Sequence, residues 1–504
     1  MISLNKITEI LIEHKLLKEI VISDEWYYNL PENVKTKSVA HITYDSRQIE
    51  KGSLFFCKGL AFKGLYLEQA IEKGADFYIS EKFYDISTEA VGIIVTDVKR
   101  AMAVVSMAFY GYPQHDLKII AYTGTKGKTT AAYFCKYILD EATDNKTALL
   151  STMETVLDGK TPIKSLLTTP ESVDLYRMMR QAVSNGMSHL VMEVSSQAYK
   201  TERVYNLKFD VGIFLNISED HIGAIEHPDF DDYFYCKREL LKNSKQIILN
   251  ENSDFYNILK ETSKSFTDKV ISYSDESKEA DYQFISGEKG AFLVRSLNDE
   301  LALNGDYQIN LMGDFNQGNA LSAMIATALT GADKNDMSKG LAIAKVPGRM
   351  EKTVSNKGVH VYIDYAHNYL SLHTLLSFVR KEHASSKLYV VIGSTGGKGV
   401  SRRHDFGKVL SELADVAILT TDDPGNERPE DIIAEIKAHL STKVEDIIII
   451  DRKEAITKAM ELANEDDVVV LAGKGSDLYQ IIDGNRLPYA GDFKIVEQLI
   501  ESGY

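Results

Sequence analysis

Cysteine is scarce in this chain of 504 residues: it occurs three times, as Cys57, Cys135 and Cys236. The three positions are far apart and have none of the spacings of a metal site, and an odd, sparse set of thiols is typical of a reducing compartment. The sequence therefore excludes a fold held together by disulfides. We expect the three cysteines to be packing residues.

Long apolar runs are also missing. No stretch approaches the roughly 20 apolar residues that a membrane-spanning helix needs. The first 18 residues mix charged side chains with apolar ones at helical spacing, which differs from the uninterrupted apolar stretch of a signal peptide. We therefore expect a cytoplasmic protein without an integral membrane segment.

Positive charge is in deficit, because 57 Lys and Arg residues stand against 73 Asp and Glu residues, a formal net charge of −16. This balance argues against a general polyanion-binding surface, so nucleic acid is not an expected partner. Any anionic ligand must be held locally by lysines, arginines and backbone amides. The composition does not identify protein partners.

Proline is rare, at nine residues, whereas hydrophobic residues make up 44% and charged residues 26% of the chain, as in a globular protein. At roughly 100 to 200 residues per domain, the length predicts three domains. We place them at residues 1–115, 116–345 and 346–504. Strand-like runs alternate with helix-length intervals, which indicates the α/β class.

The first two sections differ in their strand patterns. The first combines short strands at 53–56 and 92–95 with a helical stretch at 67–73, which predicts a small α/β module. The second has longer apolar runs with helical segments between them, as expected of a mainly parallel sheet. Its buried-strand candidates are residues 117–122, 190–192, 211–215 and 246–249.

The third section begins after Val346-Pro347-Gly348, a predicted hinge because proline and glycine interrupt regular structure. Apolar runs then recur at helix-length intervals, which predicts a Rossmann-like α/β domain. These runs are residues 359–363, 388–392, 416–419 and 468–471.

A phosphate-binding loop is predicted at residues 123–130, Thr-Gly-Thr-Lys-Gly-Lys-Thr-Thr, between a strand and a helix that begins near Lys128. It has one residue fewer between its first glycine and Gly-Lys-Thr than the common version. Backbone amides at the helix N-terminus point toward phosphate, Lys128 adds charge, and the Thr129 hydroxyl can bind magnesium. A solvated turn that matches by chance is the alternative. The predicted nucleotide-binding residues are Gly124, Thr125, Lys126, Gly127, Lys128, Thr129 and Thr130.

Three further side chains of the second section are candidates for the chemistry. Glu193 ends an apolar strand, and a carboxylate beside a phosphate loop can hold magnesium directly or through water. Without that loop it would be an ordinary strand-end acid. His221, in Asn-Ile-Ser-Glu-Asp-His at 216–221, is a candidate metal ligand or orienting donor. The surroundings of Lys237 by themselves indicate only a solvated helix lysine.

Polar segments also follow the strands of the third section. Asp364 closes a strand and Arg349 follows the hinge, and open α/β sheets bind ligands at the C-terminal ends of their strands, so both are candidates for nucleotide contact. The glycine-rich residues 393–399 do not match a dinucleotide fingerprint. A cationic amino-acid side chain would fit among the acids that follow other strands, although plain turn chemistry competes with this interpretation. These acids are Asp422, Asp423 and Asp477.

Taken in order, the motifs resemble those of the Mur ligases over essentially the whole chain. The most specific are the loop at 123–130, Glu-Val-Ser-Ser at 193–196, Phe-Asn-Gln-Gly-Asn at 315–319, Pro-Gly-Arg-Met-Glu at 347–351 and Asp-Tyr-Ala-His at 364–367. The resemblance is to the members that add the third residue of the peptidoglycan stem peptide to UDP-N-acetylmuramoyl-L-alanyl-D-glutamate. It implies an N-terminal UDP-binding domain, a central ATP-binding domain and a C-terminal domain that binds the amino acid.

The resemblance also implies roles for single residues. The loop would hold ATP, and Thr129, Glu193 and His221 would serve Mg²⁺. Lys237 matches a family lysine that is carbamylated to N6-carboxylysine, a further magnesium ligand. The expected catalytic set is thus Lys128, Glu193, His221 and Lys237, and the expected nucleotide contacts beyond the loop are Asn316, Arg349 and Asp364. The positions that match the UDP-muramoyl-dipeptide site are Ser46, in the uridine-binding segment, and Thr168, Thr169, Ser195 and Arg203.

Two departures from the family pattern bear on the amino acid that is added. Members that add meso-diaminopimelate resemble one another in an Asp-Asn-Pro-Arg loop, where this chain has Asp-Asp-Pro-Gly at 422–425. Losing a cation and gaining an acid favours a cationic side chain, so we expect L-lysine, with meso-diaminopimelate or ornithine as alternatives. Lys398 stands where many members have an arginine that clamps the α-carboxylate. Because lysine lacks the bidentate fork, Arg402 or Arg403 could share that task.

A function of a different class also stays open at this stage. A nucleotide-dependent switch or binding protein would hydrolyse ATP without making an amide. The acceptor-binding positions of the second section argue against it.

Overall fold

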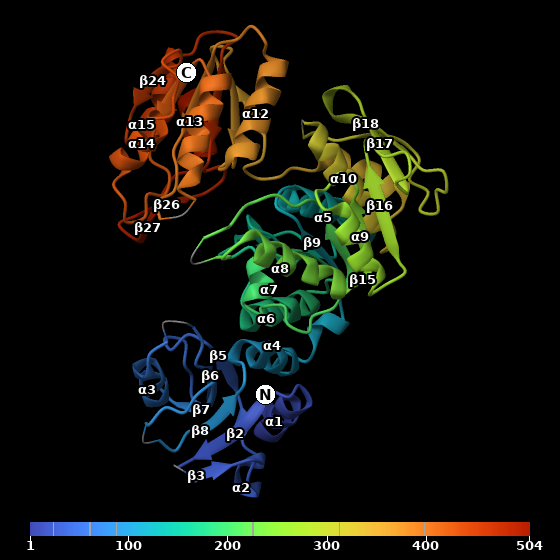
Figure 1. Cartoon of the computed structure of the whole chain (residues 1–504), viewed down its shortest axis with the longest axis vertical. Coiled ribbons are helices and arrows are strands. Elements are labelled where there is room, and N and C mark those ends of the chain that lie inside the picture. The colour runs from blue at the N-terminus through green and yellow to red at the C-terminus, as the bar shows by residue number, and fades with distance from the viewer. Residues whose placement is uncertain (24, 60–61, 87, 224–225, 312, 398) are drawn as a thin grey trace. The chain divides into compact units, whose positions relative to one another are not determined.

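The structure, a computed structural model, describes residues 1–23, 25–59, 62–86, 88–223, 226–311, 313–397 and 399–504 (Figure 1). The chain divides into two compact units. One comprises residues 1–310 and 314–344, and the other residues 311–313 and 345–504. The division lies one residue before the predicted start of the third section, and the predicted boundary between the first two sections stays a prediction.

The first sheet has the strand order β3-β2-β8-β7-β6-β5, with parallel pairs from β5 to β8 and antiparallel pairs from β8 to β3. Helices α1 and α4 pack on one face and α3 on the other, because each has an apolar stripe. The elements of this part are β1 (Ile2–Ser3), α1 (Leu4–Glu13), β2 (Leu17–Ile22), β3 (Glu25–Tyr27), α2 (Glu32–Lys35), β4 (Ser38–Val39), β5 (His41–Thr43), β6 (Ser53–Phe56), α3 (Gly64–Glu72), β7 (Ala75–Ser80), β8 (Val91–Val95), α4 (Val98–Phe109) and η1 (Pro113–His115).

The second sheet has the order β12-β11-β10-β13-β9-β14-β15-β16-β17-β18-β19 and is parallel from β10 to β17. The strands of its middle are buried on both faces, which explains their continuous apolar runs. Its strands are β9 (Lys118–Thr123), β10 (Thr147–Leu150), β11 (Glu154–Val156), β12 (Pro162–Lys164), β13 (His189–Glu193), β14 (Phe209–Phe214), β15 (Ser244–Asn250), β16 (Val270–Ser274), β17 (Tyr282–Ser286), β18 (Ala291–Arg295) and β19 (Gly305–Gln308). The helices between them are α5 (Lys128–Thr143), α6 (Ser172–Ser184), α7 (Ser196–Lys200), α8 (Phe230–Lys242), α9 (Tyr256–Lys264), η2 (Glu288–Gly290), α10 (Asp314–Ala328) and α11 (Lys334–Ile343).

The second unit contains a sheet of order β20-β21-β25-β22-β23-β24, parallel except for β20. Helices α12, α13 and α14 contribute to the core on one face, and α15 and α16 to the core on the other, so the sheet is doubly wound (Figure 1). Its elements are β20 (Glu351–Val354), β21 (His360–Asp364), α12 (Tyr369–Glu382), β22 (Leu388–Ile392), α13 (Ser401–Leu413), β23 (Val416–Leu419), α14 (Pro429–Lys437), β24 (Glu445–Ile448), α15 (Arg452–Leu462), β25 (Val468–Ala472), β26 (Tyr479–Ile482), β27 (Asn485–Pro488) and α16 (Asp492–Glu501).

The predicted α/β class is confirmed, and each predicted section has its own sheet. The three cysteines are buried as free thiols, as expected of packing residues. Within the residues described, no helix combines the length and the apolar character that crossing a membrane requires.

Candidate active site

The loop after β9 has the conformation that its glycines predict. β9 lies between β13 and β14 and parallel to both, so the three strands end at the same edge of the sheet. Gly124 has a φ of +153°, and a Cβ there would lie 3.1 Å from that of Leu215. Gly127 has a φ of +81°, and a Cβ there would lie 2.5 Å from the amide oxygen of Asn319. Both positions therefore require glycine, and α5 starts directly after them.

Asn216, which follows β14, holds this loop from one side. Its carbonyl accepts a hydrogen bond from the Thr125 N–H (3.1 Å). Its side-chain amide accepts from the Lys126 N–H (2.8 Å) and donates to the Lys126 carbonyl (3.1 Å). No role was predicted for Asn216, since these contacts join residues about ninety positions apart. Asn216 thus holds the loop through both its backbone and its side chain.

Two lysine ammonium groups converge on one carbonyl of the loop. Lys128 donates to the Gly124 oxygen over 2.8 Å, and Lys237, which is 2% exposed on α8, donates to the same oxygen over 2.8 Å. Burial lowers the pKa of Lys237 well below its ordinary value, and the charge of Lys128 lowers it further. The interpretation of Lys237 as a solvated helix lysine is therefore wrong.

Tyr233, one turn before Lys237 on α8, links three predicted site residues. Its hydroxyl lies 3.0 Å from the Thr125 hydroxyl, and the Lys237 ammonium lies 4.8 Å from its ring centre. The ring of His221 is 6.1 Å away, measured between ring centres. Tyr233 is fully buried and received no role from the sequence.

Glu193 ends β13 and is fully buried against the phosphate loop. One carboxylate oxygen accepts from the Thr129 hydroxyl (2.9 Å) and from the Thr152 N–H (2.8 Å), and the other accepts from the Thr152 hydroxyl (3.1 Å). Thr130 is buried beside Thr129. A hydroxyl and a carboxylate in contact are the hard oxygen donors that Mg²⁺ prefers, so this pair fits the predicted metal.

The predicted acceptor-binding residues surround the same strand end. The Thr152 hydroxyl lies 3.0 Å from that of Thr168. The Thr169 hydroxyl donates to the Glu193 carbonyl (3.0 Å) and accepts from the Ser195 N–H (3.1 Å). Arg203 donates to the Thr169 carbonyl (3.0 Å) and pairs with the Glu171 carboxylate (3.1 Å). The acceptor set therefore lies directly beside the predicted metal ligand.

His221 and Ser46 are less closely tied to this group. His221 has a φ of +57°, its side chain is 44% exposed, and its ring lies 3.0 Å from Glu226. Among the described residues, no hydrogen bond joins His221 to Glu193 or Lys237. Ser46 lies in the turn after β5, where its carbonyl accepts from Lys73 (3.0 Å). Their roles stay predictions.

Asn316 lies near the start of α10 and is 2% exposed. Its side-chain oxygen accepts from Asn319 (3.4 Å), the residue that faces Gly127. Asn316 is thus linked to the phosphate loop through Asn319, and its contact with the nucleotide stays a prediction.

In the second unit, Asp364 ends β21 and is buried. It accepts from the Met350 N–H (2.9 Å), and its carbonyl accepts from the Gly473 N–H after β25 (3.1 Å). Burial raises the pKa of Asp364, while the positive charge of Arg349 opposes that shift. The Arg349 guanidinium lies 5.4 Å from the Tyr365 ring. The two predicted nucleotide residues of this unit are thus neighbours.

Asp422, Asp423 and Asp477 gather around Lys474, a cation that received no role from the sequence. The Lys474 ammonium lies 2.8 Å from Asp423, 3.6 Å from Asp422 and 3.8 Å from Asp477, and its side chain is 1% exposed. Burial raises the pKa of Asp422 to about 6, although the charges of Lys474 and Arg452 act in the opposite direction. The three acids that follow β23 and β25 therefore lie together, and turn chemistry alone does not explain buried carboxylates.

Only some of the residues predicted to bind the α-carboxylate of the incoming amino acid lie in the described part of the chain. Lys398 lies outside the described residues. Arg403 is 2% exposed and is bound to Glu427 (2.8 Å) and Glu435 (2.9 Å). The suggestion that Arg403 could bind the incoming carboxylate is therefore wrong for this structure, because its guanidinium already serves two internal acids.

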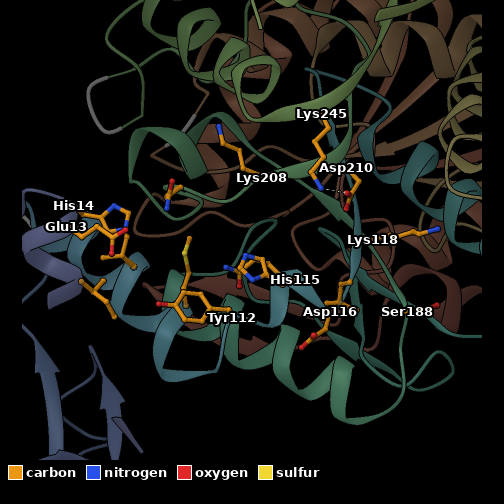
Figure 2. Close-up of a pocket in the computed structure, with 16 residues that line it drawn as sticks. Glu13, His14, Tyr112, His115, Asp116, Lys118, Ser188, Lys208, Asp210 and Lys245 are labelled. Atoms are coloured by element: carbon orange, nitrogen blue, oxygen red, sulfur yellow. Dashed lines mark hydrogen bonds and ion pairs between the residues drawn. The ribbon is translucent and has the colours of Figure 1, made fainter. Parts of the chain in front are cut away.

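A cavity of about 890 Å³ lies at the opposite end of the strands (Figure 2). Lys118 begins β9, Ser188 precedes β13, Asp210 belongs to β14 and Lys245 to β15, and all four line it. Figure 2 shows the Asp210–Lys245 ion pair, 2.7 Å long, in its wall. None of the predicted site residues lines this cavity, so it is separate from the loop that ends β9.

Comparison with known proteins agrees with this arrangement. Residues 122–327 match the Mur ligase middle domain, and residues 348–475 match the Mur ligase, glutamate ligase domain. The phosphate loop, Glu193 and Lys237 fall in the first match, and Arg349, Asp364 and Asp422 in the second.

Similarity to single proteins extends from end to end. The chain is 56% identical to the UDP-N-acetylmuramoyl-L-alanyl-D-glutamate–L-lysine ligase of Enterococcus faecalis, over 99% of both chains. It is 47% identical to the enzyme of that name from Streptococcus thermophilus, over 99% of this chain and all of the relative. A solved UDP-N-acetylmuramoyl-L-alanyl-D-glutamate–2,6-diaminopimelate ligase superposes with a TM-score of 0.64 at 25% identity, covering 94% of this chain and 97% of its own. The chain belongs to the Mur ligase family.

Proposed function

We propose that the protein is an ATP-dependent ligase that joins L-lysine to the D-glutamyl γ-carboxylate of UDP-N-acetylmuramoyl-L-alanyl-D-glutamate, a step of peptidoglycan synthesis in the cytoplasm. The observation that carries the proposal is the 56% identity, over 99% of both chains, to a lysine ligase of this kind. The arrangement of residues around the phosphate loop supports the same chemistry.

The loop supplies the ATP end of the reaction. The amides at the start of α5 and the Lys128 ammonium would bind the β- and γ-phosphates. Bound Mg²⁺ would be held by the Thr129 hydroxyl and the Glu193 carboxylate, with His221 as a further candidate, and would neutralise charge on the phosphates. Because Glu193 touches Thr129 on one side and its carbonyl holds Thr169 on the other, nucleotide and acceptor would meet at this strand end.

Lys237 fits the expected carbamate. A lysine must lose its proton before the nitrogen can attack CO₂, and burial together with Lys128 favours the neutral amine. Attack forms an N–C bond and releases a proton to solvent, so the side chain becomes an anion. That anion would attract the Lys128 ammonium, which binds the same Gly124 carbonyl, and would add an oxygen ligand for magnesium.

The reaction then needs two transfers. A γ-carboxylate oxygen of the acceptor attacks the γ-phosphorus, the bond to the bridging oxygen of ADP breaks, and an acyl phosphate forms. The neutral α-amine of lysine attacks the acyl carbon, phosphate leaves with the electron pair, and the nitrogen gives up a proton. Lys128 and the loop amides would spread the charge that develops on the transferred phosphoryl group.

The choice of lysine is tested by measuring phosphate release from ATP with the acceptor and one amino acid at a time. We expect release with L-lysine and little with meso-diaminopimelate or ornithine, and mass spectrometry should show the acceptor plus one lysyl residue. Preferential release with diaminopimelate would contradict the lysine assignment. ATP turnover that ignored both acceptor and amino acid would contradict a ligase altogether.

A further inference from the structure

The acids predicted to bind the ammonium group of the substrate already surround an ammonium group of the protein. Among the described residues, Lys474 lies between Asp422, Asp423 and Asp477, but its contacts with them are unequal. The contact with Asp423, at 2.8 Å, is a hydrogen bond, whereas those with Asp422 (3.6 Å) and Asp477 (3.8 Å) are longer. Lys474 is therefore primarily the partner of Asp423.

Asp423 is also engaged by the backbone around it. The oxygen that binds Lys474 accepts a second hydrogen bond, from the Ile481 N–H of β26 (3.0 Å). The Asp423 carbonyl accepts from the Gly396 N–H (2.8 Å), so the residue joins the loops after β22, β23 and β25. Its side chain is 16% exposed and that of Lys474 is 1% exposed. Asp423 therefore holds these loops together through contacts inside the protein.

The electrostatic surroundings agree with a permanent cation at position 474. Burial alone lowers the pKa of a lysine, but the charges of Asp422 and Asp423 outweigh it, so the pKa of Lys474 lies above its ordinary value. The Tyr479 ring centre, 5.1 Å from the ammonium, adds a face of negative potential.

We propose that Lys474 is a positioning residue that neutralises Asp423 from inside, so that Asp423 orders the amino-acid site and does not itself bind the substrate side chain. The inference rests on the proposed lysine-adding function. In the Asp-Asp-Pro-Gly loop, the acid gained at position 423 is balanced internally, and the loop's preference comes from the missing cation at Gly425.

The proposal is tested by removing the two charges singly and together. Asp423→Asn leaves the Lys474 charge without its nearest partner, so we expect the KM for lysine to rise about tenfold or more, with unchanged KM values for ATP and acceptor. Asp423→Asn combined with Lys474→Met keeps the net charge, and its KM for lysine should return to within about threefold of the unmodified enzyme. A double variant as impaired as Asp423→Asn would overturn the proposal, because it would show that Asp423 itself binds lysine. An unchanged KM in Asp423→Asn would also overturn it.

Controls separate this effect from loss of structure. The exposed pair Lys437–Asp446 (2.6 Å) lies in the same unit, and Lys437→Met with Asp446→Asn should leave every KM unchanged.

If methionine at position 474 prevents folding, Asp423→Asn with Lys474→Gln removes both charges and leaves two amides that can hydrogen-bond each other. Lys474→Met alone should shift lysine binding to higher pH, since the remaining carboxylates then hold their protons more tightly, and absence of a shift would count against the proposal.

Failure of the two proposals can be told apart. If the unmodified enzyme released no phosphate with lysine, the proposed function would be wrong. The Asp423–Lys474 pair would then still be tested by the coupling between the two substitutions in urea unfolding, and absence of coupling would overturn the pair.

Discussion

Removing the Tyr233 hydroxyl should weaken ATP binding by a small and defined amount. Tyr233→Phe deletes one hydrogen bond, to the Thr125 hydroxyl 3.0 Å away, and keeps the ring beside the Lys237 ammonium. A neutral hydrogen bond contributes about 1 kcal/mol, which corresponds to roughly a fivefold change in an equilibrium constant. The Thr125 hydroxyl keeps its contact with the Ser218 carbonyl (3.1 Å), so the loop should loosen but not unfold.

The assay is phosphate release at varied ATP with saturating acceptor and lysine. We expect the KM for ATP to rise about fivefold, with the KM for lysine unchanged. Tyr176→Phe is the matched control: the Tyr176 side chain is also fully buried, and its hydroxyl has no hydrogen-bond partner among the described residues. If the two variants had the same KM for ATP, the argument that Tyr233 orders the phosphate loop would be refuted.

Three further predictions concern other charged groups. Lys237→Arg cannot form a carbamate, so phosphate release should fall by at least about a hundredfold, and bicarbonate should restore activity to CO₂-depleted wild-type enzyme but not to the variant. Calorimetric affinity for lysine should increase as pH rises through about 6, because Asp422 then loses its proton and gains the charge that attracts the ammonium, and Asp422→Asn should abolish this dependence. Arg452→Met should lower the free energy of unfolding by about 3 to 5 kcal/mol, since it removes the cation of a fully buried ion pair and leaves the Asp492 carboxylate without it. Lys458→Met, in an exposed pair, should change the free energy of unfolding by less than about 1 kcal/mol. Equal urea midpoints for the last two variants would contradict the burial argument.

The buried strands were predictable because a buried strand has a continuous run of apolar residues in the sequence. The predicted run at 388–392 is β22, residue for residue, and the run at 416–419 is β23. Both are buried throughout, and a parallel strand covered on two faces must be apolar along its length. By contrast, β12 and β27 are exposed along their whole length, so no apolar pattern marks them.

The site was predictable only where its residues are close in the chain or carry a motif. The loop at 123–130 and Glu193 at the end of a strand have such local signals. Thr152 and Asn216 do not, because an ordinary threonine and asparagine acquire their roles through contacts with Glu193 and Lys126 across the sheet. Long-range contacts of this kind depend on strand order, which the local pattern does not specify.

Lys237 and Lys474 show why residue type alone does not determine chemistry. Both are buried lysines, and burial by itself lowers the pKa of each. After burial, the largest effect on the pKa of Lys237 comes from another lysine, Lys128, whose charge lowers it further, although Asp220 and Glu193 act in the opposite direction. The charges beside Lys474 are carboxylates, which reverse the shift and keep a permanent cation. In one unit the surroundings of the lysine thus favour the neutral amine that the proposed carbamate requires, and in the other they keep the lysine charged as the counter-ion of Asp423.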